Sequence, residues 1–172
     1  MSPAEIVVII LLVLHIAFIA LWLGAAALTS SIILPSLGQI SLSSRGEFII
    51  AALPRLSRFI VGVSTGAVLA GVILFGYETR VATGYAPSSL GTTFIAVGAI
   101  IGLISYVLAL VAAYPTANKL VKALKGAKDS DKTGSSMPAE ISKMQVRMRM
   151  VAGASGGLLG LALLLMVIGA TV

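Results

Sequence analysis

The sequence contains no cysteine and a single histidine, His15. Without thiolates the chain cannot form a disulfide, an iron–sulfur cluster or a cysteine-ligated metal site, so a bound metal would need nitrogen, oxygen or methionine sulfur. Charged residues make up only 10% of the chain. The sequence shows no paired carboxylates, no nucleophile beside a base and no phosphate-binding loop, which argues against an enzyme.

Apolar residues dominate what is present. They make up 58% of the chain, and the mean hydropathy is +1.08, far above that of a soluble domain. A helix needs roughly 20 apolar residues to cross a hydrocarbon core about 30 Å thick. Four runs are long enough: Ile6–Leu28, Phe59–Tyr77, Phe94–Tyr114 and Val151–Val172. The sequence predicts an all-α integral membrane four-helix bundle, a multi-pass protein of the cell membrane. It forms a single transmembrane domain over residues 1–172, with helices at about 4–34, 55–80, 91–124 and 140–172.

Basic residues are distributed unequally between the loops that join these runs. Eleven lie in the first and third loops, whereas the second loop has only Arg80. The positive-inside rule therefore predicts that both termini face outward and that the two basic loops face the cytoplasm, where they contact anionic lipids. No aromatic residue is interleaved with this charge, so we expect no nucleic-acid partner.

Prolines are expected to mark helix ends. Pro3 favours a helix start, and Pro35 is expected to stop the first helix because its ring cannot continue the hydrogen-bond ladder. The segment from Ser36 to Pro54 then reads as a loop with a short interfacial helix.

Small residues recur at helical spacing in three of the runs. In lipid, helices associate through close backbone approach over such faces, so the spacing predicts a tight bundle and an oligomer of like or unlike chains. The pairs are Gly62 and Gly66, Gly98 and Gly102, Gly153 and Gly157, and Gly156 and Gly160.

His15 is the main candidate functional residue, because an ionisable side chain inside a membrane needs a partner. The helical period places it on one face with Phe18, Ile19, Trp22 and Thr29. Trp22, the only tryptophan, therefore points toward the same neighbouring helix.

Three roles for His15 remain open at this stage. The imidazole could make a structural hydrogen bond to Ser64, Thr65, Ser105, Tyr106 or a backbone carbonyl. It could ligate haem iron. It could also serve a proton or metal-ion transport step near neutral pH.

If His15 ligates haem iron, the second ligand could be Met166, which is expected at a similar depth, or the histidine of a second protomer. The iron could also be five-coordinate, with no second protein ligand. The methionines at the other end of the fourth run, Met144, Met148 and Met150, are expected to pack, with a copper(I) relay as the alternative.

The first helix resembles a known family signature. The stretch from Leu14 to Gly24, followed by Ile33, Leu34 and Pro35, is similar to the histidine, Trp-x-Gly and proline pattern of the copper resistance D superfamily and its relatives. Two later stretches, Arg55–Phe59 and Val146–Met150, are similar to that group as well. The resemblance implies four-helix units in which His15 is a haem or copper ligand. The HemJ-type protoporphyrinogen oxidases also look similar, but they pair the histidine with an intramembrane lysine, and this chain has no lysine before Lys119.

The functional hypothesis is therefore a small membrane protein that binds haem b or copper and serves electron transfer. His15 is its expected metal ligand, with Trp22 and Met166 as further cofactor-binding residues. The alternative is a noncatalytic accessory subunit that packs its glycine faces against a larger respiratory or transport complex.

Overall fold

The computed structural model describes residues 2–81, 89–129 and 139–172, and the regular structure within them is helical. The elements, in chain order, are α1 (Pro3–Leu28), a π-helical turn (Thr29–Ile33), α2 (Leu34–Ser36), a 3-10 turn (Leu37–Gln39), α3 (Leu42–Val81), α4 (Ser89–Leu108), a second π-helical turn (Ala109–Ala113), α5 (Tyr114–Asp129) and α6 (Ala139–Thr171). Four segments are long and apolar enough to cross a membrane: Pro3–Gln39, Ser43–Tyr77, Leu90–Gly126 and Ile141–Thr171. The expected all-α, four-span architecture is confirmed, and the chain is a multi-pass membrane protein.

Local chemistry explains where α1 begins. The Ser2 hydroxyl accepts from the Glu5 backbone N–H, and the Glu5 carboxylate accepts from the Ser2 N–H, which forms a capping box. Pro3 follows at the first helical position, where a missing N–H costs nothing.

The expectation that Pro35 ends the first helix is wrong. The chain stays helical to Gln39, and a π turn ends two residues before the proline. A proline ring clashes with the carbonyl four residues earlier, here that of Ser31, and the wider π turn accommodates it. Pro115 stands in the same relation to the second π turn, two residues after its last residue.

The loop with a short helix expected from Ser36 to Pro54 is reduced to a break at Ile40 and Ser41. Residues from Leu42 onward belong to α3, and Pro54 lies inside this helix. Two arginine side chains bond carbonyls near the proline: Arg55 Nη1 donates to the Ala51 carbonyl at 2.6 Å, and Arg58 Nε donates to the Pro54 carbonyl at 3.2 Å. Neither of these is the Ile50 carbonyl, four residues before Pro54, which is the one that the proline leaves without its helical donor.

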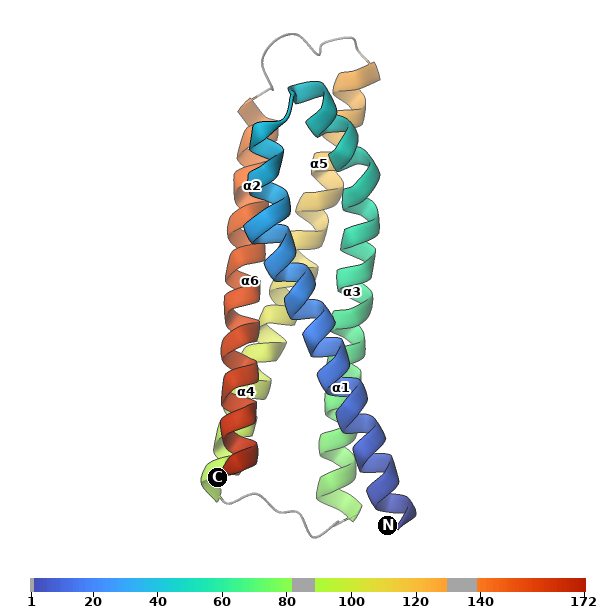
Figure 1. Ribbon diagram of the computed structural model, residues 1–172, viewed down its shortest axis with the longest axis vertical. Coiled ribbons are helices and arrows are strands. Elements are labelled where there is room, and N and C mark those ends of the chain that lie inside the picture. Colours follow the sequence, from blue (N-terminus) through green and yellow to red (C-terminus); the bar gives the residue numbers. More distant parts are fainter. Residues whose placement is uncertain (1, 82–88, 130–138) are drawn as a thin grey trace.

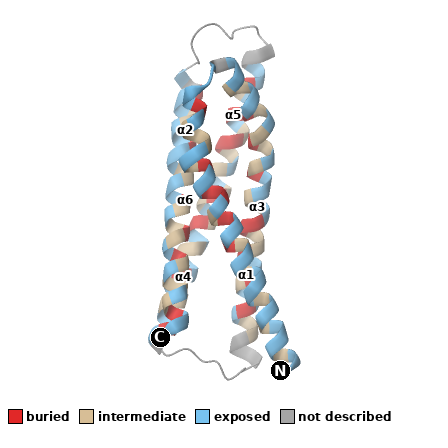
Figure 2. Ribbon diagram, in the orientation of Figure 1, coloured by how far each residue is buried: buried red, intermediate tan, exposed pale blue. Residues whose placement is uncertain are grey.

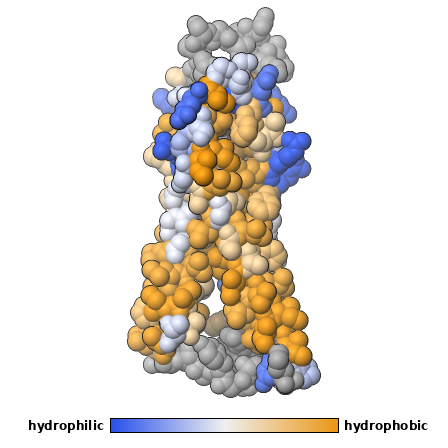
Figure 3. Space-filling view, viewed as in Figure 1, coloured by the Kyte–Doolittle hydropathy of each residue, from blue (hydrophilic) through white to orange (hydrophobic). Residues whose placement is uncertain are grey.

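The helices form two pairs, α1 with α3 and α4 with α6, which meet and then separate (Figure 1). Both termini lie at the end where the pairs separate. Buried residues gather where the pairs cross (Figure 2), around a cluster of Ile19, Trp22, Val63, Ala67 and Leu159. Beyond the crossing, α5 packs against α3 and α6 over a second apolar cluster that includes Leu53, Leu120 and Met148. Toward the termini, the space-filling surface between the pairs is hollowed, with apolar walls (Figure 3).

Only some of the glycines predicted to form close contacts do so. A Cβ at Gly66 would lie 3.0 Å from the Phe18 ring, and one at Gly98 would lie 2.9 Å from the Ala162 carbonyl oxygen. A Cβ at Gly102 would lie at ordinary van der Waals distance from the Cβ of Ala162, and one at Gly156 at such a distance from the Cβ of Ala26. The prediction is wrong for the remaining four, because a Cβ at Gly62, Gly153, Gly157 or Gly160 would meet nothing within 4 Å.

Membrane orientation is open to a direct test. We expect a cysteine introduced at Thr171 to react with a membrane-impermeant maleimide in intact cells, and one at Ser43 to react only after the cells are opened. Both positions are exposed and lie at opposite ends of the bundle, and the parent chain has no cysteine to give background labelling. The reverse labelling pattern would contradict the outward-facing termini that the charge distribution predicts.

Candidate functional site

His15 is held between α1 and α3. Its Nδ1 lies 2.8 Å from the backbone carbonyl oxygen of Ala67, and because a carbonyl can only accept, Nδ1 carries the proton. The ring rests against Gly71, one turn further along α3. A Cβ on Gly71 would lie 2.6 Å from His15 Cε1, so a side chain there would collide with the imidazole.

This hydrogen bond determines what the imidazole can do. With the proton on Nδ1, the neutral ring presents the Nε2 lone pair. Among the described residues, no donor bonds to Nε2. A histidine whose Nδ1–H donates to a backbone carbonyl is the arrangement that orients metal-ligating imidazoles in proteins. The same bond from His15 Nδ1 to the Ala67 carbonyl is also the structural hydrogen bond that the sequence predicts as one role for His15. The bond is therefore common to the structural role and the metal-ligand role.

The face predicted for helix one is confirmed. Ile19, Trp22 and Thr29 are buried, and His15 and Phe18 are half-buried. Trp22 makes an edge-to-face contact with Tyr106 of α4, with ring centroids 6.4 Å apart and planes at 83°. The Tyr106 hydroxyl lies 3.0 Å from Thr65 Oγ1, which ties α4 to α3 at the crossing.

Met166 lies in the other helix pair. Its Cγ would be 2.9 Å from a Cβ on Gly98, so the thioether packs in the contact between α6 and α4, whereas His15 packs in the contact between α1 and α3. The structure therefore does not place Met166 beside His15 as a second iron ligand.

Two of the other three methionines of α6 pack in the core, as expected. Met148 is buried in the apolar cluster beyond the crossing, at the end away from the termini, and Met144 packs against it. Met150 is 64% exposed and lies on a different face of the helix. Since these three sulfur atoms do not share one face, a relay of methionine ligands along α6 is not formed by them.

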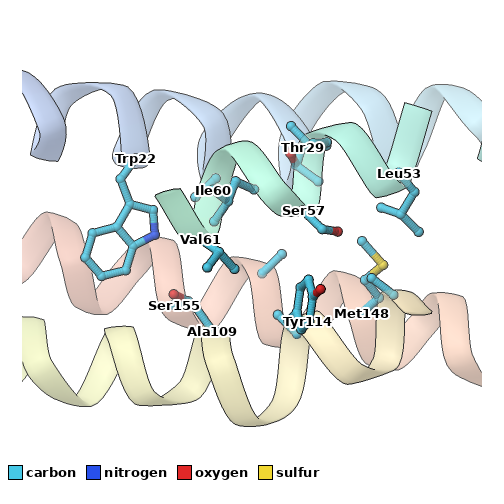
Figure 4. Close-up of a pocket in the computed structure, with 15 residues that line it drawn as sticks. Trp22, Thr29, Leu53, Ser57, Ile60, Val61, Ala109, Tyr114, Met148 and Ser155 are labelled. Atoms are coloured by element: carbon cyan, nitrogen blue, oxygen red, sulfur yellow. The ribbon is translucent and has the colours of Figure 1, made fainter. Parts of the chain in front are cut away.

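A small cavity of about 50 Å³ lies on the other side of Trp22 from the termini (Figure 4). Residues of four helices line it, among them Trp22, Ser57, Tyr114, Met148 and Ser155. Both π turns reach it, because Thr29 begins the first and Ala109 and Ala113 bound the second. π turns are frequent at functional sites. The sequence does not reveal this cavity, because Ser57 lies outside the apolar runs and Pro35 predicts a helix stop where the structure has a π turn.

Sequence reasoning also missed Ala67 and Gly71. Every residue has a carbonyl, so no side-chain pattern identifies which one receives His15. Gly71 does not belong to any of the glycine pairs at four-residue spacing. It follows the buried Ser64 by seven residues, and this spacing indicates that the two lie on the same face of α3.

Within the described ranges, no group of three histidine or acidic side chains is arranged to hold a metal ion. Comparison of the chain with protein-family models, with curated proteins and with solved structures found no match in any of the three.

Proposed function

We propose that this four-span membrane protein binds haem b or copper through His15 Nε2 and serves electron transfer. The observation that carries the proposal is the Nδ1 hydrogen bond to the Ala67 carbonyl, which fixes the tautomer and leaves Nε2 as a ligand atom. The resemblance of the first helix to the copper resistance D superfamily supports the same role. When bound, the metal would supply a one-electron redox centre.

The chain's own residues would position and shield that centre. Ala67 orients the imidazole, and Gly71 leaves space for it. Trp22, seven residues further along the same face of α1, is the flanking aromatic residue. The cavity beyond Trp22, about 50 Å³, is too small for a porphyrin. The hollow between the helix pairs is the space that remains for one (Figure 3).

The test is an absorption spectrum of the purified protein, produced with haem and copper supplied and recorded oxidised and then dithionite-reduced. We expect a Soret band, or bound copper by elemental analysis, that is lost in His15→Ala and in His15→Gln, because neither replacement restores a ligating imidazole nitrogen. Met166→Ala is the matched control and should keep the signal, since Met166 packs in the other helix pair.

A colourless and metal-free protein would contradict the proposal, as would a signal unchanged in His15→Gln. That result would favour the second candidate, a noncatalytic accessory subunit. The observation behind this second candidate is the apolar hollow between the helix pairs, which a partner's transmembrane helix could fill. Reproducible co-purification with a larger membrane complex, without colour, would support it.

A further inference from the structure

The helix α3 is longer than a membrane is thick. Its 40 residues span about 60 Å, at about 1.5 Å per residue, whereas a hydrocarbon core is about 30 Å thick. Residues 59–77 carry no charge, and they match the core in length. The charged residues that precede them in α3 are Arg45, Glu47, Arg55 and Arg58. Because charge is costly in hydrocarbon, the first half of α3 projects beyond it, at the end that the charge distribution assigns to the cytoplasm.

An apolar groove opens on this projecting half, between α3 and the helical segment around α2. Its volume is about 180 Å³, and every residue that lines it except Thr29 is apolar. Leu34 and Leu37 line it from the side of α2, and Phe48, which is 43% exposed, lies where the groove meets the surface. Figure 3 shows apolar atoms at this end of the molecule, bordered by hydrophilic ones. A dry cavity of about 150 Å³ holds a molecule the size of benzene, so the groove accepts a leucine or phenylalanine side chain.

Two arginines of α3 flank this groove. Arg45 precedes Phe48 by three residues and Arg55 follows it by seven, so the helical period places both on its side of α3. Among the described residues neither guanidinium has an acidic partner. Arg45 Nε is buried without a hydrogen-bond partner, and Arg55 bonds only the carbonyl of Ala51. A buried donor is costly to leave unpaired, so the groove favours a partner that brings acceptors, and a carboxylate matches a guanidinium with two parallel hydrogen bonds.

The position of the arginines separates the possible partners. Arg45 lies 13 residues before Arg58, which is about 20 Å along the helix. The headgroup layer extends only about 5–8 Å beyond the hydrocarbon on each side, so Arg45 lies past the lipid phosphates. A second copy of the chain would bring the same positive charges to the contact, and like charges in an interface are unfavourable. The charge and the position together favour an acidic partner protein.

We propose that this groove docks an acidic amphipathic helix of a cytoplasmic partner protein, with apolar side chains in the groove beside Phe48 and carboxylates on Arg45 and Arg55. The two arginines are ten residues apart, about 15 Å along α3, so they match carboxylates about three turns apart on the docked helix. An amphipathic helix in an apolar groove is a recurring mode of peptide recognition. The groove lies at the opposite end of the bundle from the hollow between the helix pairs, and docking does not depend on a metal at His15.

The test uses the full chain in nanodiscs of phosphatidylcholine and a fluorescent alanine-based helical peptide. One face of the peptide carries two leucines between two glutamates that are three turns apart. We expect saturable binding by fluorescence anisotropy, about tenfold weaker when the glutamates are replaced by glutamine. Arg45→Ala and Arg55→Ala should each weaken binding about tenfold, the loss of one charge-assisted hydrogen bond. Lys122→Ala removes the same charge on the side of α5 away from Leu120 and should leave binding unchanged.

Filling the groove gives an independent check. Ala52 lines it, and Ala52→Phe should abolish peptide binding while the protein retains its helical circular dichroism. Four outcomes would overturn the proposal. The glutamate peptide could fail to bind, or it could bind no better than the glutamine peptide. Displacement of the peptide when phosphatidylglycerol is added to the nanodiscs would assign the arginines to lipid. Self-association that Ala52→Phe abolishes would assign the groove to a second copy of the chain.

Discussion

Replacing Gly98 with alanine is expected to lower the free energy of unfolding in detergent by about 1–3 kcal/mol, the usual cost of overpacking. The added methyl group would lie 2.9 Å from the Ala162 carbonyl oxygen and 2.9 Å from Met166 Cγ. The first of these is backbone, so α4 and α6 must move apart. In lipid, close packing is what holds such helices together, because apolar burial does not favour association there.

Gly157 provides the matched control on α6, because a Cβ there meets nothing within 4 Å. Gly157→Ala should leave the protein as stable or raise its stability by up to about 1 kcal/mol, since alanine is the better helix former. Thermal or denaturant unfolding followed by circular dichroism measures both variants. Equal losses at the two positions would contradict the assignment of close contact to Gly98 alone.

The second large effect concerns Gly71 and His15 together. Gly71→Ala should cost about 1–3 kcal/mol, because the new methyl group would lie 2.6 Å from His15 Cε1 and push the imidazole off the Ala67 carbonyl. His15→Ala alone should cost about 1 kcal/mol, the value of an interhelical hydrogen bond in a membrane. The double variant should cost less than the sum of the two, since removal of the ring relieves the clash.

The measured quantity is the coupling energy of this double-mutant cycle, expected at about 0.5–3 kcal/mol. Gly62 supplies the control on the same helix, because a Cβ there meets nothing within 4 Å. Gly62→Ala combined with His15→Ala should be additive. Additivity in the Gly71 cycle as well would mean that the imidazole does not rest against Gly71.

The sequence predicts the four spans correctly because the thickness of a bilayer sets a minimum length for an apolar helix, and few other structures satisfy that length. It also predicts the buried face of α1, because the helical period fixes which of His15, Ile19 and Trp22 share a side. Both predictions rest on patterns along the sequence, namely the length of an apolar run and the helical period, and contacts between helices do not change these patterns.

Features that depend on neighbouring helices could not be predicted in this way. The four-residue spacing that Gly98 and Gly157 both satisfy does not say which one meets another backbone. Pro35 predicts the end of the first helix and Pro54 the start of the second span, because a sequence does not show that a π turn precedes Pro35 or that Pro54 lies inside a longer helix. His15's partner is a carbonyl, and the chain offers one at every residue.

The buried serines of α4 and α6 have a consequence for how these two helices are aligned. Ser105 and Ser155 are 0% and 4% exposed, and their hydroxyl oxygens lie 2.9 Å apart, with Ser105 also donating to the Ser155 carbonyl. The helix faces around these serines are rich in glycine and alanine. Such small residues do not interlock, so they would allow one helix to shift along the other. A slip of one turn would separate the two hydroxyls and take each from its present partner in largely apolar surroundings. The pair therefore sets the register of α4 against α6, a specificity that small apolar residues alone do not provide.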